Sequence, residues 1–308
     1  MDYFDADVAY LVGLIVARGQ LIEQGEERRI LVEFPGSTLQ VEGTHSAFDQ
    51  PTEIKLGLVD IAWRLRNLLE TDIDIISSTH GNHTLLVRFH RNNMIWRNLR
   101  LILGSATHFG TFTLPNVLFD RDTPLEWKHE FLRGFADVAG NIRRANRYVD
   151  GRNRVRLDVL NYKDNWRLPV QLCELLQDHL SIPVQLIAWG HPNMGRDFRE
   201  HQLNIFAVPF RKIGFTFRHK QIVLEELAQE DEKNFPNAQY MPCPGERALR
   251  RTKESDEREA DTLHLPPKLC GKHFDAYWQI CRQLGCRKRP AVQDISYEED
   301  VEQEVIPE

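Results

Sequence analysis

The stretch LVGLIVARG (residues 11–19) and the stretch LRGFADVAG (residues 132–140) follow one pattern of apolar and small residues. Each has a glycine in its third position, Gly13 and Gly134, and these glycines are 121 residues apart. A glycine inside a helix costs about 1 kcal/mol relative to alanine, so a packing gain must offset that cost twice. Because small residues let helices approach closely, we expect two helices that contact each other at these glycines.

The last two positions of the stretches mark the ends of these helices. Gly19 and Gly140 hold the ninth position, and a glycine there typically ends a helix. The eighth position is Arg18 in the first stretch and Ala139 in the second. The two helices are therefore expected to end alike but to carry different side chains at their ends.

The surroundings of the two stretches also repeat. In the first half, the periodicity of apolar residues and the turn residues predict a helix at 6–18, two strands around Gly25 within 20–34, a helix at 51–70, a hairpin at 73–90 and a helix at 93–103. In the second half they predict a helix at 127–139, a hairpin around Asp150-Gly151 at 141–160, a helix at 166–180, strands at 184–190 and 201–208, and a helix at 218–228.

An internal repeat of this size predicts an α+β protein with two pseudo-symmetric α-β-β-α-β-β-α domains and a C-terminal helical extension. The expected divisions are a first domain at 1–104, a linker rich in Thr, Pro and Asp at 105–126, a second domain at 127–228, an extension at 229–290 and an acidic tail at 291–308.

Charge and composition limit the class of protein. The net charge is −6, but residues 291–308 hold seven acids and no Lys or Arg, so the remaining chain carries +1. Such a tail is expected to be disordered. Five cysteines do not indicate a disulfide framework. The acidic N-terminus lacks the features of a signal peptide, and no apolar run approaches the ~20 residues of a membrane span. We expect a cytoplasmic protein that does not contact a membrane.

At YLVGLIVARG (10–19) and FLRGFADVAG (131–140) the chain resembles the LAGLIDADG homing-endonuclease family in its single-chain, two-motif form. FRKIGF (210–215), with Lys220 and Leu224 after it, is similar to the end of that family's domain. The resemblance covers roughly residues 6–228. It implies that the motif helices form the interface between the two domains of a monomer. It also implies that the strands form a saddle that lies in the major groove of double-stranded DNA.

The same resemblance places a metal-binding acid at the eighth motif position, where this chain has Arg18 and Ala139. Divalent metals that assist phosphodiester cleavage need such oxygen ligands. Alanine offers none, and arginine repels a metal. Asp137 precedes Ala139 by two residues, a rotation of about 200° on a helix, and is expected to be solvated or to contact the linker. We expect no intact catalytic site and no metal. Arg18 is expected to contact either a DNA phosphate or an internal acid.

The hairpin at 141–160 is the more basic of the two motif hairpins. It carries Arg143, Arg144, Arg147, Arg152, Arg154 and Arg156, with Asn141, Asn146, Tyr148 and Asn153 between them. Arginine contacts phosphates and pairs with guanine, and asparagine suits adenine. A solvated basic hairpin is the simpler alternative.

The first half is less basic. Its motif hairpin has Arg28 and Arg29 beside Glu23, Glu26, Glu27 and Glu33, and the hairpin at 73–90 and the residues after it add His80, His83, Arg88, His90, Arg91 and Arg97. The second half is therefore expected to make the stronger DNA contact, with Arg18, Arg28, Arg29 and Arg88 contributing from the first. A non-palindromic target would follow.

The C-terminal extension offers a weaker pattern. Cys270, His273, Cys281 and Cys286 have a spacing that fits no strong zinc motif. The segment 265–290 reads more simply as a helix that docks through its aromatic residues, with Arg287-Lys288-Arg289 as a further phosphate contact.

Together these features favour a sequence-selective double-stranded DNA-binding protein, a cleavage-deficient relative of homing endonucleases that needs no cofactor. One alternative is an active, Mg²⁺-dependent DNA endonuclease whose acids are relocated or supplied by a partner subunit. The other alternative is an intron RNA maturase, with RNA as the partner.

Overall fold

The computed structural model describes residues 4–41, 48–79, 81–144, 151–160, 167–192 and 199–240. His80, Asn146, Arg147, Tyr148, the four residues of the weak zinc pattern and the acidic tail lie outside these ranges. Among the described residues, no helix combines the length and apolar character that crossing a bilayer requires.

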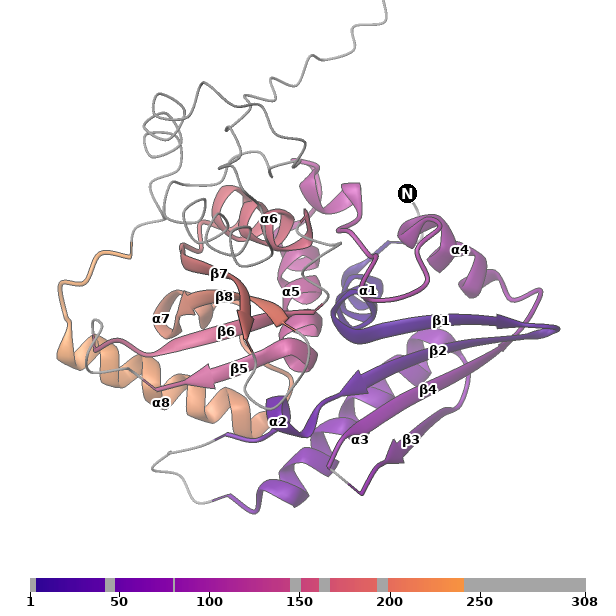
Figure 1. The fold of residues 1–308 in the computed structure, drawn as a ribbon, viewed down its shortest axis with the longest axis horizontal. Helices are drawn as coiled ribbons and strands as arrows, with labels where there is room; N and C mark the ends of the chain where they lie inside the picture. Colours follow the sequence, from indigo (N-terminus) through magenta and orange to yellow (C-terminus); the bar gives the residue numbers. More distant parts are fainter. Residues whose placement is uncertain are drawn as a thin grey trace, which may run out of the picture. The chain divides into compact units, whose positions relative to one another are not determined.

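Each half of the described chain runs helix, two strands, helix, two strands, helix, with short additional helices (Figure 1). The first half contains α1 (Ala6–Arg18), β1 (Gly19–Gln24), β2 (Glu27–Phe34), α2 (Gly36–Leu39), α3 (Gln50–Leu69), β3 (Ile73–Ser77), β4 (His83–His90) and α4 (Met94–Leu103). The second contains η1 (Asn116–Phe119), α5 (Leu125–Ala139), β5 (Gly140–Arg143), β6 (Arg154–Val159), α6 (Arg167–Glu174), η2 (Leu175–His179), β7 (Val184–Pro192), β8 (Arg199–Phe206), α7 (Ala207–Phe210) and α8 (Arg218–Asn234). The predicted α+β class and element order are confirmed. The last helix runs on to Asn234 and does not end at Ala228 as expected.

Two four-stranded antiparallel sheets form the body, in the orders β1-β2-β4-β3 and β5-β6-β8-β7. We call them sheet A and sheet B. Their registers correspond, because Gly19 pairs with Val32 in sheet A and Gly140 pairs with Leu157 in sheet B. Since side chains alternate between the faces of a strand, each sheet has one buried apolar face and an opposite face that carries charged side chains, which we call its polar face. The apolar faces are buried through Leu21, Ile30, Val32, Leu85 and Val87 in sheet A and Val155, Leu157, Leu203 and Ile205 in sheet B.

Helices α1 and α5 lie side by side between the two sheets (Figure 1). A Cβ atom at Gly13 would lie 2.1 Å from the carbonyl oxygen of Phe131, and one at Gly134 would lie 2.2 Å from that of Tyr10. The same 121-residue shift that relates the two motifs relates these two contacts. The glycines therefore let the two backbones touch, as the sequence pattern predicts.

Gly19 and Gly140 end the two helices, but with φ of −91° and −88° they are extended and not left-handed. A positive φ therefore does not explain why these two positions are glycine. A Cβ at Gly19 would lie 2.5 Å from the carbonyl oxygen of Ile15, and one at Gly140 would lie 2.5 Å from that of Ala136. Each strand therefore turns sharply away from the helix end, which brings the helix ends next to the sheets.

The segment between the repeats is bonded to the first sheet. The backbone N–H of Phe109 donates to Gly19 O at 2.9 Å, and that of Leu21 donates to Thr107 O at 2.7 Å. Farther along, Leu118 is fully buried. The expected linker thus packs along the free edge of β1.

Candidate nucleic-acid interface

The C-terminal ends of α1 and α5 carry Arg18 and Ala139, which are 8% and 0% exposed. Neither side chain supplies a carboxylate. The positive charge of Arg18 acts on the buried Asp158 of β6 and opposes the rise of its pKa. Arg18 was expected to contact either a DNA phosphate or an internal acid. Because Arg18 is buried and its charge acts on Asp158, the structure favours the internal acid.

Asp158 belongs to a buried polar cluster on the polar face of sheet B. Asn141 Nδ2 donates to Asp158 Oδ2 at 2.5 Å, and Arg156 Nε lies 2.6 Å from Asp158 Oδ1. Arg156 Nη2 lies 3.8 Å from Glu200 Oε1, and Gln202 Nε2 donates to the same oxygen at 2.8 Å. The cluster ties β5, β6 and β8 together through side chains as well as backbone.

The carboxyl of Asp158 is perturbed by this environment. Burial raises its pKa to about 6, and Arg156 lowers it while Glu200 raises it. The sequence interpretation missed Asp158 and Glu200, although a period of two places residue 158 on the same face as residue 156. Both acids pair with the same arginine, Arg156, and the charge of Arg18 also acts on Asp158, so the cluster differs from an open metal site. Among the described residues, no group of three or more His, Cys, Asp or Glu side chains is placed to hold a metal ion.

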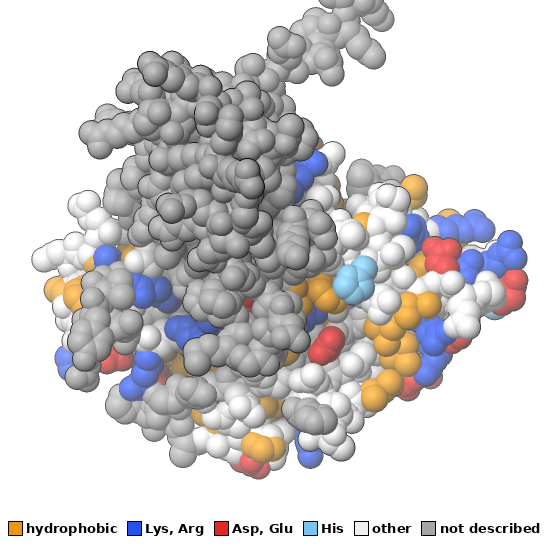
Figure 2. Space-filling view, in the orientation of Figure 1, with side chains coloured by type: hydrophobic (Ala, Val, Ile, Leu, Met, Phe, Trp, Pro, Cys, Tyr) orange, Lys and Arg blue, Asp and Glu red, His pale blue; other side chains and the backbone are white. Residues whose placement is uncertain are grey.

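The polar face of sheet B carries four of the expected DNA-binding residues, Asn141, Arg143, Arg154 and Arg156. The register sets Arg143 opposite Arg154, and it sets Asn141, Arg156 and Asn204 in one row across three strands. Arg143 is exposed, as is Arg144, which follows β5. Figure 2 shows Lys and Arg side chains on the side of the molecule where β5 and β6 lie. The structure thus puts arginines and amides on one face of the sheet, which we call the sheet B polar face, with Arg143 exposed at its end and Asn141 and Arg156 in the buried cluster.

Aromatic rings support two of the arginines of the same hairpin. The guanidinium of Arg152 lies 4.4 Å from the ring centroid of Phe206 and 5.7 Å from that of Tyr240. The guanidinium of Arg154 lies 5.6 Å from the Phe206 ring. Such cation–π contacts limit the motion of long side chains. They hold the guanidinium groups near the strand ends.

The polar face of sheet A differs in charge. Arg29 Nε lies 3.5 Å from Glu27 Oε2, and Arg88 Nε lies 3.6 Å from Glu27 Oε1. Arg88 also forms an ion pair with Asp74. The remainder of this face includes the apolar residues Ile22, Leu31, Ile76 and Leu86. Figure 2 shows this mixture as a hydrophobic strip beside basic and acidic side chains. The asymmetry between the halves that the sequence suggested is present in the side chains.

Arg28 does not share the surface with Arg29. It has the same parity in β2 as the buried Ile30 and Val32, so its side chain lies on the helix-covered side of sheet A. There its guanidinium donates to Gly25 O at 2.8 Å and lies 3.7 Å from Glu23 Oε2. We therefore leave Arg28 out of the candidate interface. The alternation of side chains along β2 alone would have placed Arg28 on the helix-covered side of the sheet.

The expectation that Asp137 is a solvated or linker-contacting acid is wrong. Asp137 is 0% exposed, accepts a hydrogen bond from the Tyr10 hydroxyl at 2.7 Å and accepts another from Thr216 N at 2.9 Å. Burial raises its pKa, and the charge of Lys220 opposes that rise. Helix α5 is covered by α1 and by the segment before α8, so the side of the helix opposite Ala139 does not face solvent.

Lys220 completes this buried group. Its Nζ donates to Gly140 O at 2.9 Å, next to the end of α5, and burial lowers its pKa to about 8. The carbonyl groups at a helix C-terminus lack partners within the helix, so an ammonium group that donates to them offsets part of the cost of its own burial. Lys220 thus fixes the point where α5 meets β5.

No family model matches the chain, and no curated protein matches it. Several solved structures do. A structure of mesophilic variants of the homing endonuclease I-DmoI is 16% identical, with a TM-score of 0.38, and the match covers 70% of this chain and 90% of that one. The meganuclease I-SmaMI bound to uncleavable DNA is 10% identical, with a TM-score of 0.40 and coverage of 74% and 90%. Full-length DUF199/WhiA from Thermatoga maritima is 14% identical, with a TM-score of 0.41 and coverage of 73% and 60%.

Proposed function

We propose that this protein binds double-stranded DNA sequence-selectively and does not cleave it. The observation that carries the proposal is the basic outer end of sheet B. There Arg143 lies opposite Arg154 and Arg144 follows β5, with Arg143 and Arg144 exposed, while Asn141 and Arg156 lie behind them in the buried cluster with Asp158. A two-stranded ribbon fits the major groove of B-DNA. Arginine donates to phosphates and to guanine, and asparagine pairs with adenine. The sheet B polar face has the shape and the donors for this task.

The proposal assigns different tasks to the two sheets. On sheet A, Glu27 and Asp74 pair with Arg29 and Arg88 at the surface, so the charges of that face largely cancel. On sheet B, the acids Asp158 and Glu200 are buried with Arg156, whereas the cationic side chains of Arg143 and Arg144 at the end of β5 are exposed to solvent. We expect sheet B to supply most of the binding free energy, and a target without two-fold symmetry.

The first test is the salt dependence of binding. Changing Arg143 and Arg144 together to alanine should weaken binding to a selected duplex. It should also reduce the slope of log K against log salt by about 1 for each phosphate that the variant no longer neutralises. The target is first selected from random duplex DNA, and affinity is then measured by fluorescence anisotropy over a range of salt concentrations.

A matched control removes the same charge elsewhere. The double change of Arg121 and Arg218 to alanine alters residues that are not on the polar face of either sheet, and its slope should equal that of the wild type. An unchanged slope in the Arg143/Arg144 variant, or an equal reduction in the control, would remove the support for the sheet B polar face.

The second test concerns cleavage. The purified wild type should leave its selected duplex and a supercoiled plasmid library intact in Mg²⁺ and in Mn²⁺, because the helix ends offer Arg18 and Ala139 in place of carboxylates. A competent homing endonuclease on its own site shows that the assay detects cutting. Metal-dependent cleavage by the pure protein would favour the endonuclease alternative. Asp158→Asn and Glu200→Gln would then show whether the buried acids of sheet B are responsible.

RNA is the remaining alternative partner. Structured RNA and duplex DNA present different grooves, and side chains cannot enter the deep, narrow major groove of an A-form helix. Competition of a labelled duplex against a structured intron RNA separates the two hypotheses. Stronger competition by the RNA than by unlabelled duplex would favour a maturase.

A further inference from the structure

The C-terminal part of α8 holds the segment of chain that leads into β6. Asp231 of α8 is 1% exposed. Its carboxylate accepts the backbone N–H of Asn153 at 2.9 Å and 3.2 Å, and the side-chain Nδ2 of the same residue at 2.8 Å. Asn153 Nδ2 also donates to Leu227 O at 3.1 Å, and Asn153 O accepts from Ala207 N at 3.0 Å. We call these contacts the Asp231 clamp. They occupy the amide of Asn153 within the protein, so this asparagine is not presented to a base.

The two arginines that flank Asn153 in the sequence pack together on one aromatic ring. The guanidinium groups of Arg152 and Arg154 lie 4.4 Å and 5.6 Å from the centroid of Phe206. Phe206 lies opposite Arg154 in the register of β6 with β8, and its ring also packs against Tyr240, with centroids 5.2 Å apart. Asn153 thus points toward α8 while both of its neighbours lie against the same ring. The direction of Asn153 therefore sets the direction in which two arginines leave the backbone.

The Asp231 clamp is a polar anchor that is separate from the apolar anchor of α8. The helix is buried through the apolar side chains of Val223, Leu224, Leu227 and Ala228, which precede Asp231. Burial of apolar surface is the main term that holds a helix on a protein body. A change at Asp231 should therefore release Asn153 while α8 stays docked.

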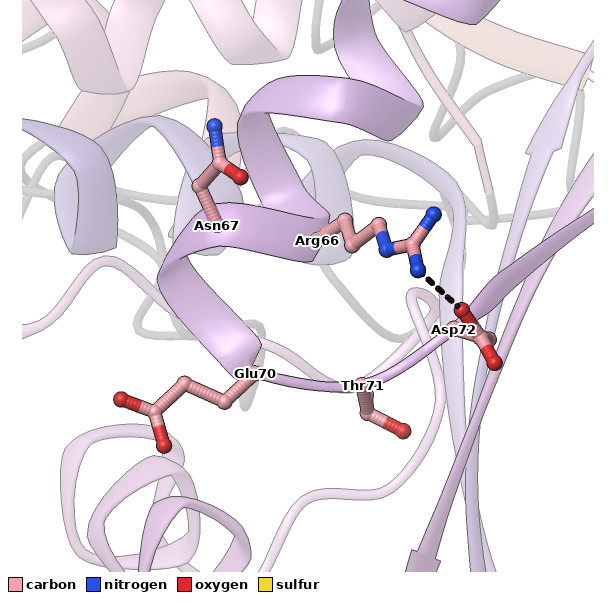
Figure 3. A pocket seen from close by; sticks show the side chains of 5 residues that line it. All are labelled: Arg66, Asn67, Glu70, Thr71 and Asp72. Carbon is pink, nitrogen blue, oxygen red and sulfur yellow. Dashed lines mark ion pairs between the residues drawn. The ribbon is translucent and has the colours of Figure 1, made fainter.

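A buried carboxylate holds its partner more firmly than an exposed one. In the open hollow at the C-terminal end of α3, Arg66 Nη2 lies 3.0 Å from Asp72 Oδ1, and both side chains are more than half exposed (Figure 3). Such exposed pairs contribute little, because solvent screens them and the long side chain must be ordered. The donors at Asp231 are buried, and hydrogen bonds to an ionised group are stronger than those between neutral groups. Burial raises the pKa of Asp231 to about 6 and the hydrogen bonds from Asn153 oppose that rise, so the carboxyl is charged at neutral pH.

We propose that Asp231 is a positioning residue for DNA binding, which holds Asn153 so that Arg152 and Arg154 are presented in a fixed direction at the start of β6. The proposal rests on the proposed function, because it is the duplex that these two arginines would contact. Long side chains that are ordered before binding lose less conformational entropy when they bind. Releasing Asn153 should therefore weaken binding although every arginine is still present in the chain.

The variant Asp231→Asn tests the proposal, because charge and position predict opposite effects. It removes a negative charge from a protein that binds a polyanion, so electrostatics alone would tighten binding. Loss of the clamp should instead weaken binding to the selected duplex by about tenfold, since two arginines must then be ordered during binding. Glu230→Gln removes the same charge from the exposed neighbouring residue and is the matched control, which should bind at least as tightly as the wild type. An Asp231→Asn variant that binds like Glu230→Gln overturns the proposal.

A double-mutant cycle separates positioning from a general loss of structure. If Asp231 acts through the two arginines, Asp231→Asn should change affinity by less than about twofold in a protein that already carries Arg152→Ala and Arg154→Ala. In a protein that carries Arg144→Ala it should have its full effect. Circular dichroism and urea unfolding establish that each variant is folded under the conditions of the assay. Equal losses of affinity in both backgrounds would overturn the proposal.

The same measurements distinguish this inference from the proposed function. A wild type that selects no duplex contradicts the proposed function and the role of Asp231 together. A wild type that binds its duplex no more tightly than the Asp231→Asn variant contradicts the role of Asp231 alone. Asn153→Ala removes the other half of the clamp, and we expect it to weaken binding to a similar extent as Asp231→Asn.

Discussion

Replacing Gly13 with alanine should lower the free energy of unfolding by roughly 3 kcal/mol or more, because the added methyl group overpacks a backbone contact. The new Cβ would lie 2.1 Å from the carbonyl oxygen of Phe131 and 2.9 Å from the amide nitrogen of Phe135. Neither atom can move without shifting α5. Urea unfolding followed by circular dichroism measures the effect. Gly134→Ala should behave alike, since its Cβ would meet Tyr10 O at 2.2 Å.

Gly25 provides the control, because replacing it changes a glycine to alanine without creating a contact between helices. It has a φ of +54°, and a Cβ there would have no heavy atom within 4 Å. Gly25→Ala should therefore cost only the strain of a left-handed alanine, about 1–2 kcal/mol. A Gly13 variant no less stable than the Gly25 variant would show that α1 and α5 do not meet as closely as the structure places them.

The sequence was informative where one physical constraint dominates. The paired glycines predicted the contact of α1 with α5. A glycine inside a helix is unfavourable, and a close approach of the two backbones explains why each helix has one at the same position. The bounds of α1 follow from an unbroken apolar run that ends at Arg18 and Gly19. The hairpin at Gly25 follows from a turn residue between two alternating segments. These are local signals, and the structure contains each of them.

The candidate site was harder to predict because its side chains are set by tertiary neighbours. Asp137 resembles a surface acid in a sequence, and only the packing of Tyr10 and Thr216 around it explains its burial. Asp158 needed the register of three strands before it could be placed beside Asn141. Arg28 is the exception. The alternation of side chains in β2 predicts that Arg28 lies on the same side as the buried Ile30 and Val32. The sequence interpretation assigned Arg28 to the DNA-binding surface because of its charge.

Lys220→Met should also produce a large decrease in stability, about 3 kcal/mol at pH 7, because it removes one partner from a buried charged group. Lys220 Nζ donates to Gly140 O at 2.9 Å and more distantly to Ala136 O at 3.4 Å. Its charge also offsets that of the buried Asp137. Methionine keeps the packing against the Phe215 ring, from which Nζ lies 4.4 Å. Lys212→Met, at an exposed lysine, is the matched control and should change stability by less than about 0.5 kcal/mol.

The pH dependence of this effect follows from the pKa of Lys220, which burial lowers from 10.5 to about 8. Between these two values the unfolded chain binds more protons than the native protein. The contribution of Lys220 to stability therefore rises with pH across that window. We expect the difference in unfolding free energy between the wild type and Lys220→Met to grow as the pH is raised from about 8 to about 10.5. Urea unfolding of both proteins at several pH values measures it. A difference that shrinks over this range would mean that Lys220 holds its proton more tightly when folded, and that Asp137 outweighs the cost of burial.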